Sequence, residues 1–266
     1  MAEAVAYPKN ADELLNTIDS LTEYGVPYFL AGALSNVLFK SHVYNGVVVK
    51  TTKMRDKIVA DGEISAFCGA RISEVTRLMT SLEYGGMEGL AGIPGTVGGM
   101  VKQNAGAYGY EISDLFKRAI CYSPKERRLI KFSKEDMVFS YRKSALSDTD
   151  TVLISATFEL VAKPKNDILR ELSRLRAKRL ESQPISEPSL GSVFKRYKGT
   201  GAGYYVDKCG LKGYSIGGAR VSDKHAGFIV NTGNATADDY LRLIEYVKTR
   251  VYAEFAIELE EEIEII

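Results

Sequence analysis

The run Gly92-Ile93-Pro94-Gly95-Thr96-Val97-Gly98-Gly99, continued by Gln103-Asn104-Ala105-Gly106-Ala107-Tyr108-Gly109, dominates the centre of the chain. Glycine has no Cβ, so it lets another group approach the backbone closely and tolerates positive φ. Such a loop can present successive N–H groups to a diphosphate. Pro94 fixes one φ, which makes the loop stiff. Glycine content alone favours a tight crossover between packed elements equally well.

The composition is that of a soluble globular protein, with 266 residues of which 45% are hydrophobic and 26% charged. This length suffices for one large domain or two modest ones. The net charge of +1 and the lack of a basic, aromatic-interleaved stripe argue against a nucleic-acid partner. We find no apolar run of membrane-spanning length and no signal-peptide pattern, so we expect no membrane partner.

Cysteine and histidine are sparse. Cys68, Cys121 and Cys209 are odd in number and far apart, which suits neither a disulfide framework nor a zinc site. This usage indicates a reducing compartment, and we expect a cytoplasmic protein. The two histidines, His42 and His225, are too few for a histidine-rich metal site, so no metal is expected.

The first part of the chain reads as a helix followed by strands. Apolar residues recur at helical spacing over residues 11–24, with Asn10 as the N-cap. Strands are expected at 27–30 and 46–51. Residues 31–36 between them form a turn at a strand end, where α/β folds commonly bind ligands. With a single glycine, this turn is equally well an ordinary connection or a phosphate loop.

The middle of the chain changes from helix to strand. An amphipathic helix at 72–84 leads into the glycine-rich stretch, and strands follow at 119–122, 128–131 and 151–161. Residues 140–144, Ser-Tyr-Arg-Lys-Ser, lie between the last two strands. By itself an arginine there indicates a solvated charge.

The last third begins with a basic helix at 167–181, whose composition is typical of a charged face over an apolar stripe. A proline-containing linker follows at 183–190, and this change in composition predicts a domain boundary near residue 165. A long helix is expected at 235–255 and a closing strand at 257–266.

The closing strand carries glutamates at alternate positions, so that they share one face: Glu258, Glu260, Glu262 and Glu264. Such a face normally indicates solvent exposure. A glutamate turned into a site would be the exception.

Taken together, the motifs resemble those of the UDP-N-acetylenolpyruvoylglucosamine reductase family, bacterial flavoenzymes that complete UDP-N-acetylmuramic acid for peptidoglycan. The matching segments run in family order over nearly the whole chain: 89–99, 104–109, 141–144, 179–184, 191–195, 210–213, 222–231 and 259–262. The chain lacks the extra tyrosine-bearing loop, so it resembles the shorter of the two subtypes.

The resemblance implies an α+β protein with a two-lobed FAD-binding domain of the vanillyl-alcohol-oxidase type and a smaller α/β substrate-binding domain. The expected FAD domain is 1–165 (lobes 1–52 and 53–165), the substrate domain 166–256, and 257–266 returns to the active site. The resemblance also implies non-covalent FAD that is reduced by NADPH. The expected reaction converts the enolpyruvyl ether of UDP-N-acetylglucosamine to UDP-N-acetylmuramic acid. We expect small-molecule partners only and a monomer.

The resemblance assigns roles by motif position. Ser192 is the expected proton donor, while Arg142 and Glu262 stabilise the enolate-like intermediate. A guanidinium suits the charge that develops beside a carboxylate, and a serine must be closely placed to act as an acid. The residues expected to bind FAD are Gly32, Ser35, Asn36, Gly92, Pro94, Gly95, Thr96, Gly98, Gly99, Asn104, Ala105, Gly106 and Ala107. Those expected to bind substrate are Tyr141, Lys195, Arg179 and Gln183.

Two alternatives stay open. The first is a flavin oxidoreductase with another substrate, against which the segments at Ser192 and His225 argue. The second is a nucleotide-binding protein without redox activity. It is suggested by Ala33 and Leu34, which stand where the family's first phosphate loop reads Gly-Gly-Gly-Ser-Asn. The family's N-terminal strand is also expected to be missing. A yellow protein that NADPH bleaches would exclude the second alternative.

Overall fold

The computed structural model describes residues 2–266 and separates into two compact units. Unit 1 comprises the chain up to Leu34 together with Tyr44–Arg176. Unit 2 comprises Ser35–Val43 and Ala177–Ile266. Composition indicated a single boundary near residue 165, where a helix begins. The division instead falls inside that helix, α5 (Lys165–Ser182), and a short N-terminal segment belongs to unit 2.

Unit 1 starts with a parallel three-stranded sheet in the order β1-β4-β2. Its strands are β1 (Ala2–Ala6), β4 (Tyr44–Lys50) and β2 (Tyr28–Ala31). Helix α1 (Ala11–Glu23) begins at Asn10, whose side chain accepts a hydrogen bond from the N–H of Glu13 at 2.8 Å. This confirms the expected N-cap, and Leu14 and Ile18 bury the apolar face of the helix.

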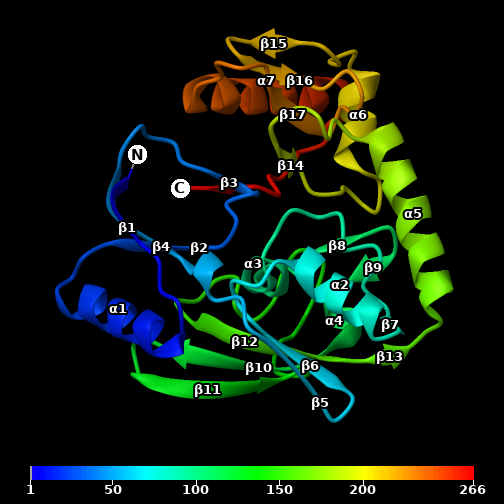
Figure 1. Ribbon diagram of the computed structural model, residues 1–266. Helices are drawn as coiled ribbons and strands as arrows, with labels where there is room; N and C mark the ends of the chain where they lie inside the picture. The colour runs from blue at the N-terminus through cyan, green and yellow to red at the C-terminus, as the bar shows by residue number, and fades with distance from the viewer. Residues whose placement is uncertain (1) are drawn as a thin grey trace. The chain divides into compact units, whose positions relative to one another are not determined.

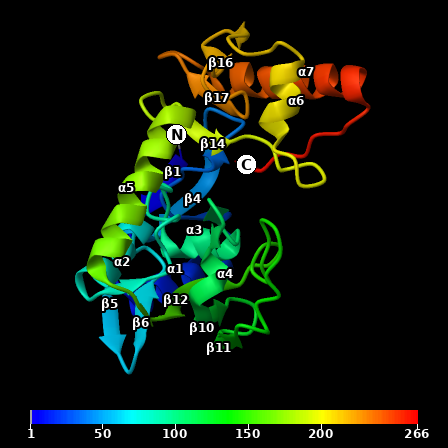
Figure 2. The same cartoon turned by 90° about the vertical axis from the view of Figure 1, so that its right-hand side faces the viewer.

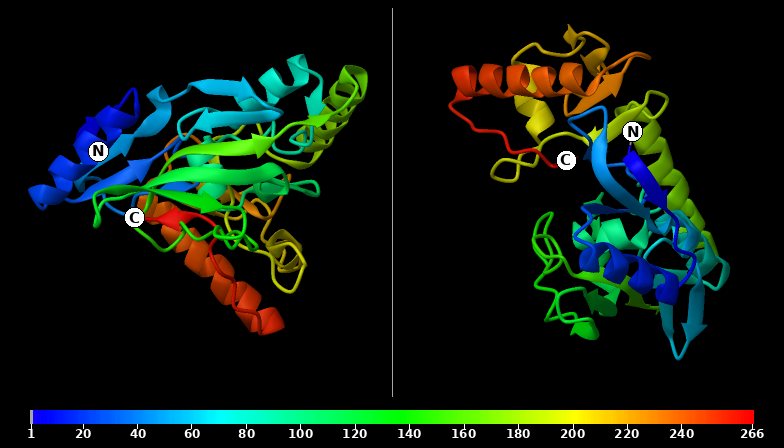
Figure 3. Two further views of the ribbon diagram at one scale, coloured as in Figure 1. Left: turned by 90° about the horizontal axis from the view of Figure 1, so that it is seen from below. Right: turned by 90° about the vertical axis from the view of Figure 1, so that its left-hand side faces the viewer.

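An antiparallel five-stranded sheet forms the rest of the unit 1 framework, in the order β11-β10-β12-β6-β5. The strands are β11 (Arg128–Ser133), β10 (Phe116–Ser123), β12 (Val152–Glu159), β6 (Glu63–Phe67) and β5 (Lys57–Ala60). Figure 3 shows these strands side by side in the view from below. The shorter elements are η1 (Thr51–Lys53), β7 (Tyr84–Gly85), β8 (Gly106–Ala107), β9 (Tyr110–Glu111) and β13 (Val161–Ala162).

The helices α2 (Ile72–Ser81), α3 (Val97–Lys102) and α4 (Ile112–Leu115) complete unit 1, and α2 and α3 lie over one face of the five-stranded sheet (Figure 1). Helix α2 ends before the predicted residue 84. The chain turns at Glu83, which has a φ of +62°, and then enters β7.

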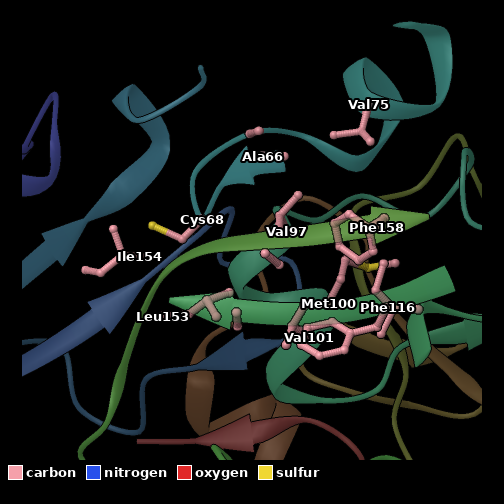
Figure 4. Close-up of a cluster of buried hydrophobic side chains, with 14 of the residues drawn as sticks. Ala66, Cys68, Val75, Val97, Met100, Val101, Phe116, Leu153, Ile154 and Phe158 are labelled. Carbon is pink, nitrogen blue, oxygen red and sulfur yellow. The ribbon is translucent and has the colours of Figure 1, made fainter. Parts of the chain in front are cut away.

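The core of unit 1 fixes the glycine-rich loop in place through α3. Figure 4 shows Val97, Met100 and Val101 of this helix among Phe116 and Phe158 of the sheet. All five side chains are buried. Burying a side chain of this size contributes about 1.5–3 kcal/mol. The loop that leads into α3 is therefore attached to a rigid base.

Unit 2 is built on a four-stranded antiparallel sheet in the order β14-β17-β16-β15. Its strands are β14 (Ser189–Ser192), β17 (Phe228–Asn231), β16 (Ala219–Val221) and β15 (Ser215–Ile216). Helix α7 (Ala237–Phe255) packs on β15, β16 and α6 (Ala202–Lys208) (Figure 2). A capping box between Thr236 and Asp239 starts α7, close to its predicted start.

The predicted closing strand is wrong over most of its length. Only β18 (Glu264–Ile265) pairs in a ladder, parallel to β3 (Val37–Leu38). The residues before β18 place Ile257, Leu259 and Ile263 in the core of unit 2. The alternation of apolar and acidic residues therefore predicted correctly that these apolar side chains are buried. A ladder needs a paired neighbour over several successive residues, and within residues 2–266 the part of this segment before β18 has only an isolated bridge between Glu261 and Phe194.

Candidate functional site

Backbone hydrogen bonds tie the first turn of α3, where the glycine-rich stretch enters the helix, to the segment that leads into α2. Gly98 N–H donates to the carbonyl of Cys68 at 2.8 Å, and Val97 N–H donates to that of Ala70 at 2.8 Å. A Cβ on Gly98 would lie only 3.2 Å from the Cβ of Cys68. The N–H of Gly98 is thus already used, and its glycine serves close packing.

The turn after β2 touches this loop at one point. A Cβ on Gly32 would lie 2.3 Å from Thr96 Oγ1, so only glycine fits there without a shift. Thr96 is 2% exposed, and its Oγ1 has no hydrogen-bond partner within residues 2–266. Leaving a buried hydroxyl without a hydrogen-bond partner costs about 1–3 kcal/mol. Such groups are rare in folded proteins, and one beside a glycine loop is consistent with a ligand that supplies the partner.

These features fit the expected FAD. Two adjoining segments contain the backbone at Gly32, the hydroxyl of Thr96, Gly95 of the loop and Gly99 in the first turn of α3. At Gly99 an added Cβ would meet its nearest neighbour only at 4.0 Å. Glycine loops with open backbone are suited to diphosphates. Gly92 and Pro94 belong to the same loop.

Asn104 is a packed structural residue. It is 1% exposed and has a φ of +40°. Its Nδ2 donates to Glu111 Oε2 at 3.0 Å and to the carbonyl of Ser140 at 3.0 Å. Its Oδ1 accepts from the N–H of Ser113 at 3.3 Å. The side chain thus binds other parts of the protein, and the contact with the cofactor stays a prediction for this residue.

Ala105, Gly106 and Ala107 follow Asn104 and lead into the β8–β9 hairpin, in which Gly106 pairs with Glu111 and Ala107 with Tyr110. A Cβ on Gly106 would lie 2.7 Å from the carbonyl oxygen of Tyr110. The hairpin therefore requires glycine at this position for its own packing.

Arg142 occupies a strained turn. Ser140 and Lys143 exchange backbone hydrogen bonds at 3.0 and 3.1 Å, which leaves Tyr141 and Arg142 as the turn residues. Arg142 has a φ of +56°, a region that costs a residue with a Cβ about 1–2 kcal/mol. Its Nη2 donates to the carbonyl of Gly106 at 3.2 Å, and its Cζ lies 5.0 Å from the centre of the Tyr141 ring.

In unit 2, a bulge sets the direction of Ser192. Ser189 pairs with Val230 and Ser192 with Phe228, so β14 contains one residue more than β17 between the two pairs. Gly191 has a φ of +81° in this bulge. Bulges of this kind turn a side chain to a new direction and occur often beside active sites.

Glu262 is bound to the same region of unit 2. Its N–H donates to the carbonyl of Val193, the residue after Ser192, at 2.7 Å. Asn36 Nδ2 donates to the carbonyl of Glu262 at 3.1 Å, and the N–H of Glu264 donates to the carbonyl of Asn36 at 2.9 Å. Ser35 and Asn36 therefore belong to unit 2, whereas Gly32 of the same turn belongs to unit 1.

The residues expected to bind substrate lie in both units. In unit 2, Lys195 Nζ forms an ion pair with Glu260 at 3.2 Å, and at this exposure such a pair contributes little to stability. Arg179 Nη1 donates to Gln183 Oε1 at 3.5 Å at the end of α5. Tyr141 of unit 1 is 42% exposed.

Sequence reasoning gave no role to His225 or Glu111. His225 Nδ1 accepts from the N–H of Gly227 at 3.0 Å, and its ring packs on Phe228, the residue paired with Ser192. Burial lowers the pKa of His225, which favours the neutral form of the ring. Glu111 lies two residues after the Asn104–Gly109 motif, and that position was the only signal for it.

Comparison with known proteins agrees with this geometry. Residues 2–123 match the protein family described as "FAD binding domain". Residues 183–266 match the family described as "UDP-N-acetylenolpyruvoylglucosamine reductase, C-terminal domain". The protein is an FAD-dependent oxidoreductase, and the expected fold class is confirmed.

The reductase of Caldanaerobacter subterraneus subsp. tengcongensis is 41% identical over 265 residues, covering 100% of this chain and 87% of the relative. That of Caldicellulosiruptor saccharolyticus is 41% identical over 267 residues, covering 100% and 86%. The crystal structure of the Thermus caldophilus reductase matches with a TM-score of 0.83 and 30% identity, covering 99% of this chain and 92% of that one. The chain belongs to the UDP-N-acetylenolpyruvoylglucosamine reductase family.

Proposed function

We propose that the protein reduces UDP-N-acetylglucosamine enolpyruvate to UDP-N-acetylmuramic acid, with NADPH as the reductant and FAD bound non-covalently. Similarity to the reductases over the full chain supports the reaction. The structural observation that carries the proposal is the contact at Gly32, where the backbone meets the unpartnered, buried hydroxyl of Thr96.

Bound FAD would accept a hydride from NADPH and supply it to the enolpyruvyl double bond. The residues proposed to hold it are Gly32, Gly92, Pro94, Gly95, Thr96 and Gly99. The Thr96 hydroxyl would gain the hydrogen-bond partner that it lacks among residues 2–266. Gly98, Asn104 and Gly106 support this loop and its neighbour through packing and hydrogen bonds to the protein.

The reduction adds one hydride and one proton across a carbon–carbon double bond. Ser192 Oγ–H donates the proton to the carbon beside the carboxylate and regains a proton from solvent. Arg142 neutralises the charge that develops on the carboxylate side, as a planar guanidinium can do with two N–H groups. We assign Glu262 to the same step because its backbone is bound to the residue after Ser192.

The diphosphate and sugar of the substrate require cationic and polar groups. Lys195 and Arg179 are the proposed phosphate-binding residues, with Gln183 and Tyr141 as hydrogen-bonding partners.

The described part of the chain, residues 2–266, contains no helix long and apolar enough to cross a membrane. We further propose that the enzyme works as a cytoplasmic monomer.

The test is a set of three measurements on the purified chain. Saturating FAD at a hundred times its Kd should stabilise the fold by about 2.7 kcal/mol and raise the melting temperature by roughly 5–10 °C. NADPH should then bleach the flavin under anaerobic conditions, and UDP-N-acetylglucosamine enolpyruvate should restore its colour.

Each failure points to one alternative. A flavin that bleaches but is not reoxidised by the enolpyruvyl ether would indicate an oxidoreductase with another substrate. The absence of a flavin spectrum and of a thermal shift would indicate a nucleotide-binding protein without redox activity.

A further inference from the structure

Arg142 is held by the protein at two separate points in unit 1. A left-handed arginine persists only when its surroundings determine its conformation, because the backbone alone disfavours it. One anchor holds the turn that carries the residue, and the other holds the guanidinium itself.

The first anchor is the carbonyl of Ser140, at the start of the turn. It accepts the N–H of Lys143 across the turn and the amide of Asn104 at 3.0 Å. Asn104 is almost fully buried, so its amide has no access to water as a substitute partner. The position of the turn therefore depends on the orientation of the Asn104 amide.

The second anchor is the carbonyl of Gly106, which accepts Nη2 of Arg142 at 3.2 Å. Gly106 faces Glu111 in the β8–β9 hairpin, and a Cβ on Gly106 would lie 2.9 Å from Cγ of Glu111. The stem of the Glu111 side chain is therefore packed against the residue that holds the guanidinium.

Glu111 joins the two anchors. Its Oε2 accepts the Asn104 amide at 3.0 Å, and its stem packs against Gly106. We propose that Glu111 is a positioning residue for Arg142, acting through Asn104 and Gly106. The inference rests on the proposed function only for the catalytic role of Arg142.

The physical consequence concerns the Asn104 amide. Without the Glu111 carboxylate, one of its N–H bonds loses its acceptor in a buried place, and the amide can rotate away from Ser140. The turn would then relax toward an unstrained backbone and carry Arg142 with it. Misplacing a catalytic group by about 1 Å can reduce a rate on the order of a hundredfold.

The experiment compares three variants of the FAD-loaded full chain. Glu111→Ala removes the acceptor, whereas Glu111→Gln keeps one oxygen that can still accept from Asn104. Asp114→Ala is the matched control, because Asp114 and the N-cap residue Glu111 form the capping box of α4, and the variant disrupts that box without removing an acceptor of Asn104: Asp114 Oδ2 accepts the N–H of Glu111 at 2.7 Å.

We expect Glu111→Ala to slow flavin reoxidation by the enolpyruvyl ether about tenfold or more, with bleaching by NADPH unchanged. Glu111→Gln should recover most of this loss. Asp114→Ala should lower the melting temperature and leave both rates unchanged. Equal rate losses in Glu111→Ala and Asp114→Ala would overturn the proposal, because the effect would then be general destabilisation.

A second readout does not depend on turnover. In protein labelled with ¹⁵N-arginine, the Nε–H signal of Arg142 can be assigned by its loss in Arg142→Lys. We expect this signal to move toward the position of a freely rotating arginine in Glu111→Ala but not in Asp114→Ala. An unchanged signal would refute the positioning role even if activity fell.

The two readouts also separate this inference from the proposed function. If the wild-type flavin were not reoxidised by the enolpyruvyl ether but the Arg142 signal moved in Glu111→Ala, the reaction would be wrong and the positioning role right. Adding Glu111→Ala to Arg142→Lys should slow reoxidation little further, because coupled residues are not additive. Full additivity would mean that Glu111 acts independently of Arg142.

Discussion

A Cβ atom on Gly32 would lie 2.3 Å from Thr96 Oγ1, which brings two loops from distant parts of the chain into contact. Gly32 follows β2 directly, and Thr96 directly precedes α3. The threonine hydroxyl that meets the glycine is buried and has no partner within residues 2–266.

Gly32→Ala should destabilise the fold by about 1–3 kcal/mol, because the added methyl overpacks against Thr96 Oγ1. It should also abolish the thermal shift caused by FAD. Combining it with Thr96→Ala removes the atom in the way, so stability should recover while FAD binding does not. Gly201→Ala is the control, since a Cβ there meets nothing within 4 Å. A Gly32→Ala protein with normal stability and normal FAD binding would refute the close contact.

Arg142→Lys keeps the charge but loses the planar fork, so reoxidation of the flavin should fall strongly with the melting temperature unchanged. A comparison of Arg142→Gly and Arg142→Ala isolates the backbone. Both should be inactive, but the glycine variant should be more stable by about 1 kcal/mol because it tolerates the φ of +56°. Chemical denaturation measures this difference, and a more stable alanine variant would argue against strain in the turn.

Ser192→Ala deletes one oxygen and should leave bleaching by NADPH near normal. Reoxidation by the enolpyruvyl ether should slow by about a hundredfold or more, the scale expected for a positioned acid. Ser192→Cys should retain some activity because a thiol can also give up a proton. Stopped-flow measurement of both half-reactions decides the matter: equal slowing of the two would assign Ser192 a structural role, and no slowing would require another acid.

Gly191→Ala tests whether the bulge directs Ser192. The added Cβ meets nothing within 4 Å, so the change acts through the φ of +81° alone. Gly210→Ala is matched, with a φ of +68° and equally open space. Both should lose about 1–2 kcal/mol of stability. Only Gly191→Ala should slow reoxidation, and equal rates in the two variants would show that the bulge has no catalytic role.

The pairing of Glu63 should make stability depend on pH. Arg118 first and Lys117 second lower the pKa of Glu63 to about 2. Since the folded-state pKa lies below the unfolded value, the ionised carboxylate stabilises the fold at neutral pH. That contribution is lost as the pH falls from about 4.5 toward 2. Glu63→Gln should therefore lower the melting temperature most near neutral pH and low salt. A difference that grew on acidification would contradict the sign.

Much of the framework followed from local pattern. The Asn10 cap of α1 and the strands near residues 28, 47, 120, 130 and 155 were legible because capping and apolar spacing act over a few residues. The motif order along the chain also identified the family, which the relatives confirm. These local patterns did not predict which residues far apart in the sequence would be in contact.

Asn104 illustrates that limit. In the sequence it reads as part of a cofactor loop, yet its side chain is satisfied by Glu111, Ser113 and Ser140. The N–H of Gly98 likewise donates to the carbonyl of Cys68. A buried polar group takes whichever partner the fold brings near, and burial and proximity are properties of the packed chain.

The linear sequence was therefore sufficient for the family, the N-cap of α1, most of the strands and the presence of a glycine loop, since each depends on residue type at short spacing. Packing set the rest. It paired Gly32 with Thr96, placed Asn36 on the backbone of Glu262, and left only Glu264–Ile265 of the closing segment in a ladder. These outcomes depend on contacts between residues far apart in the chain, whose energies arise only once both are buried together.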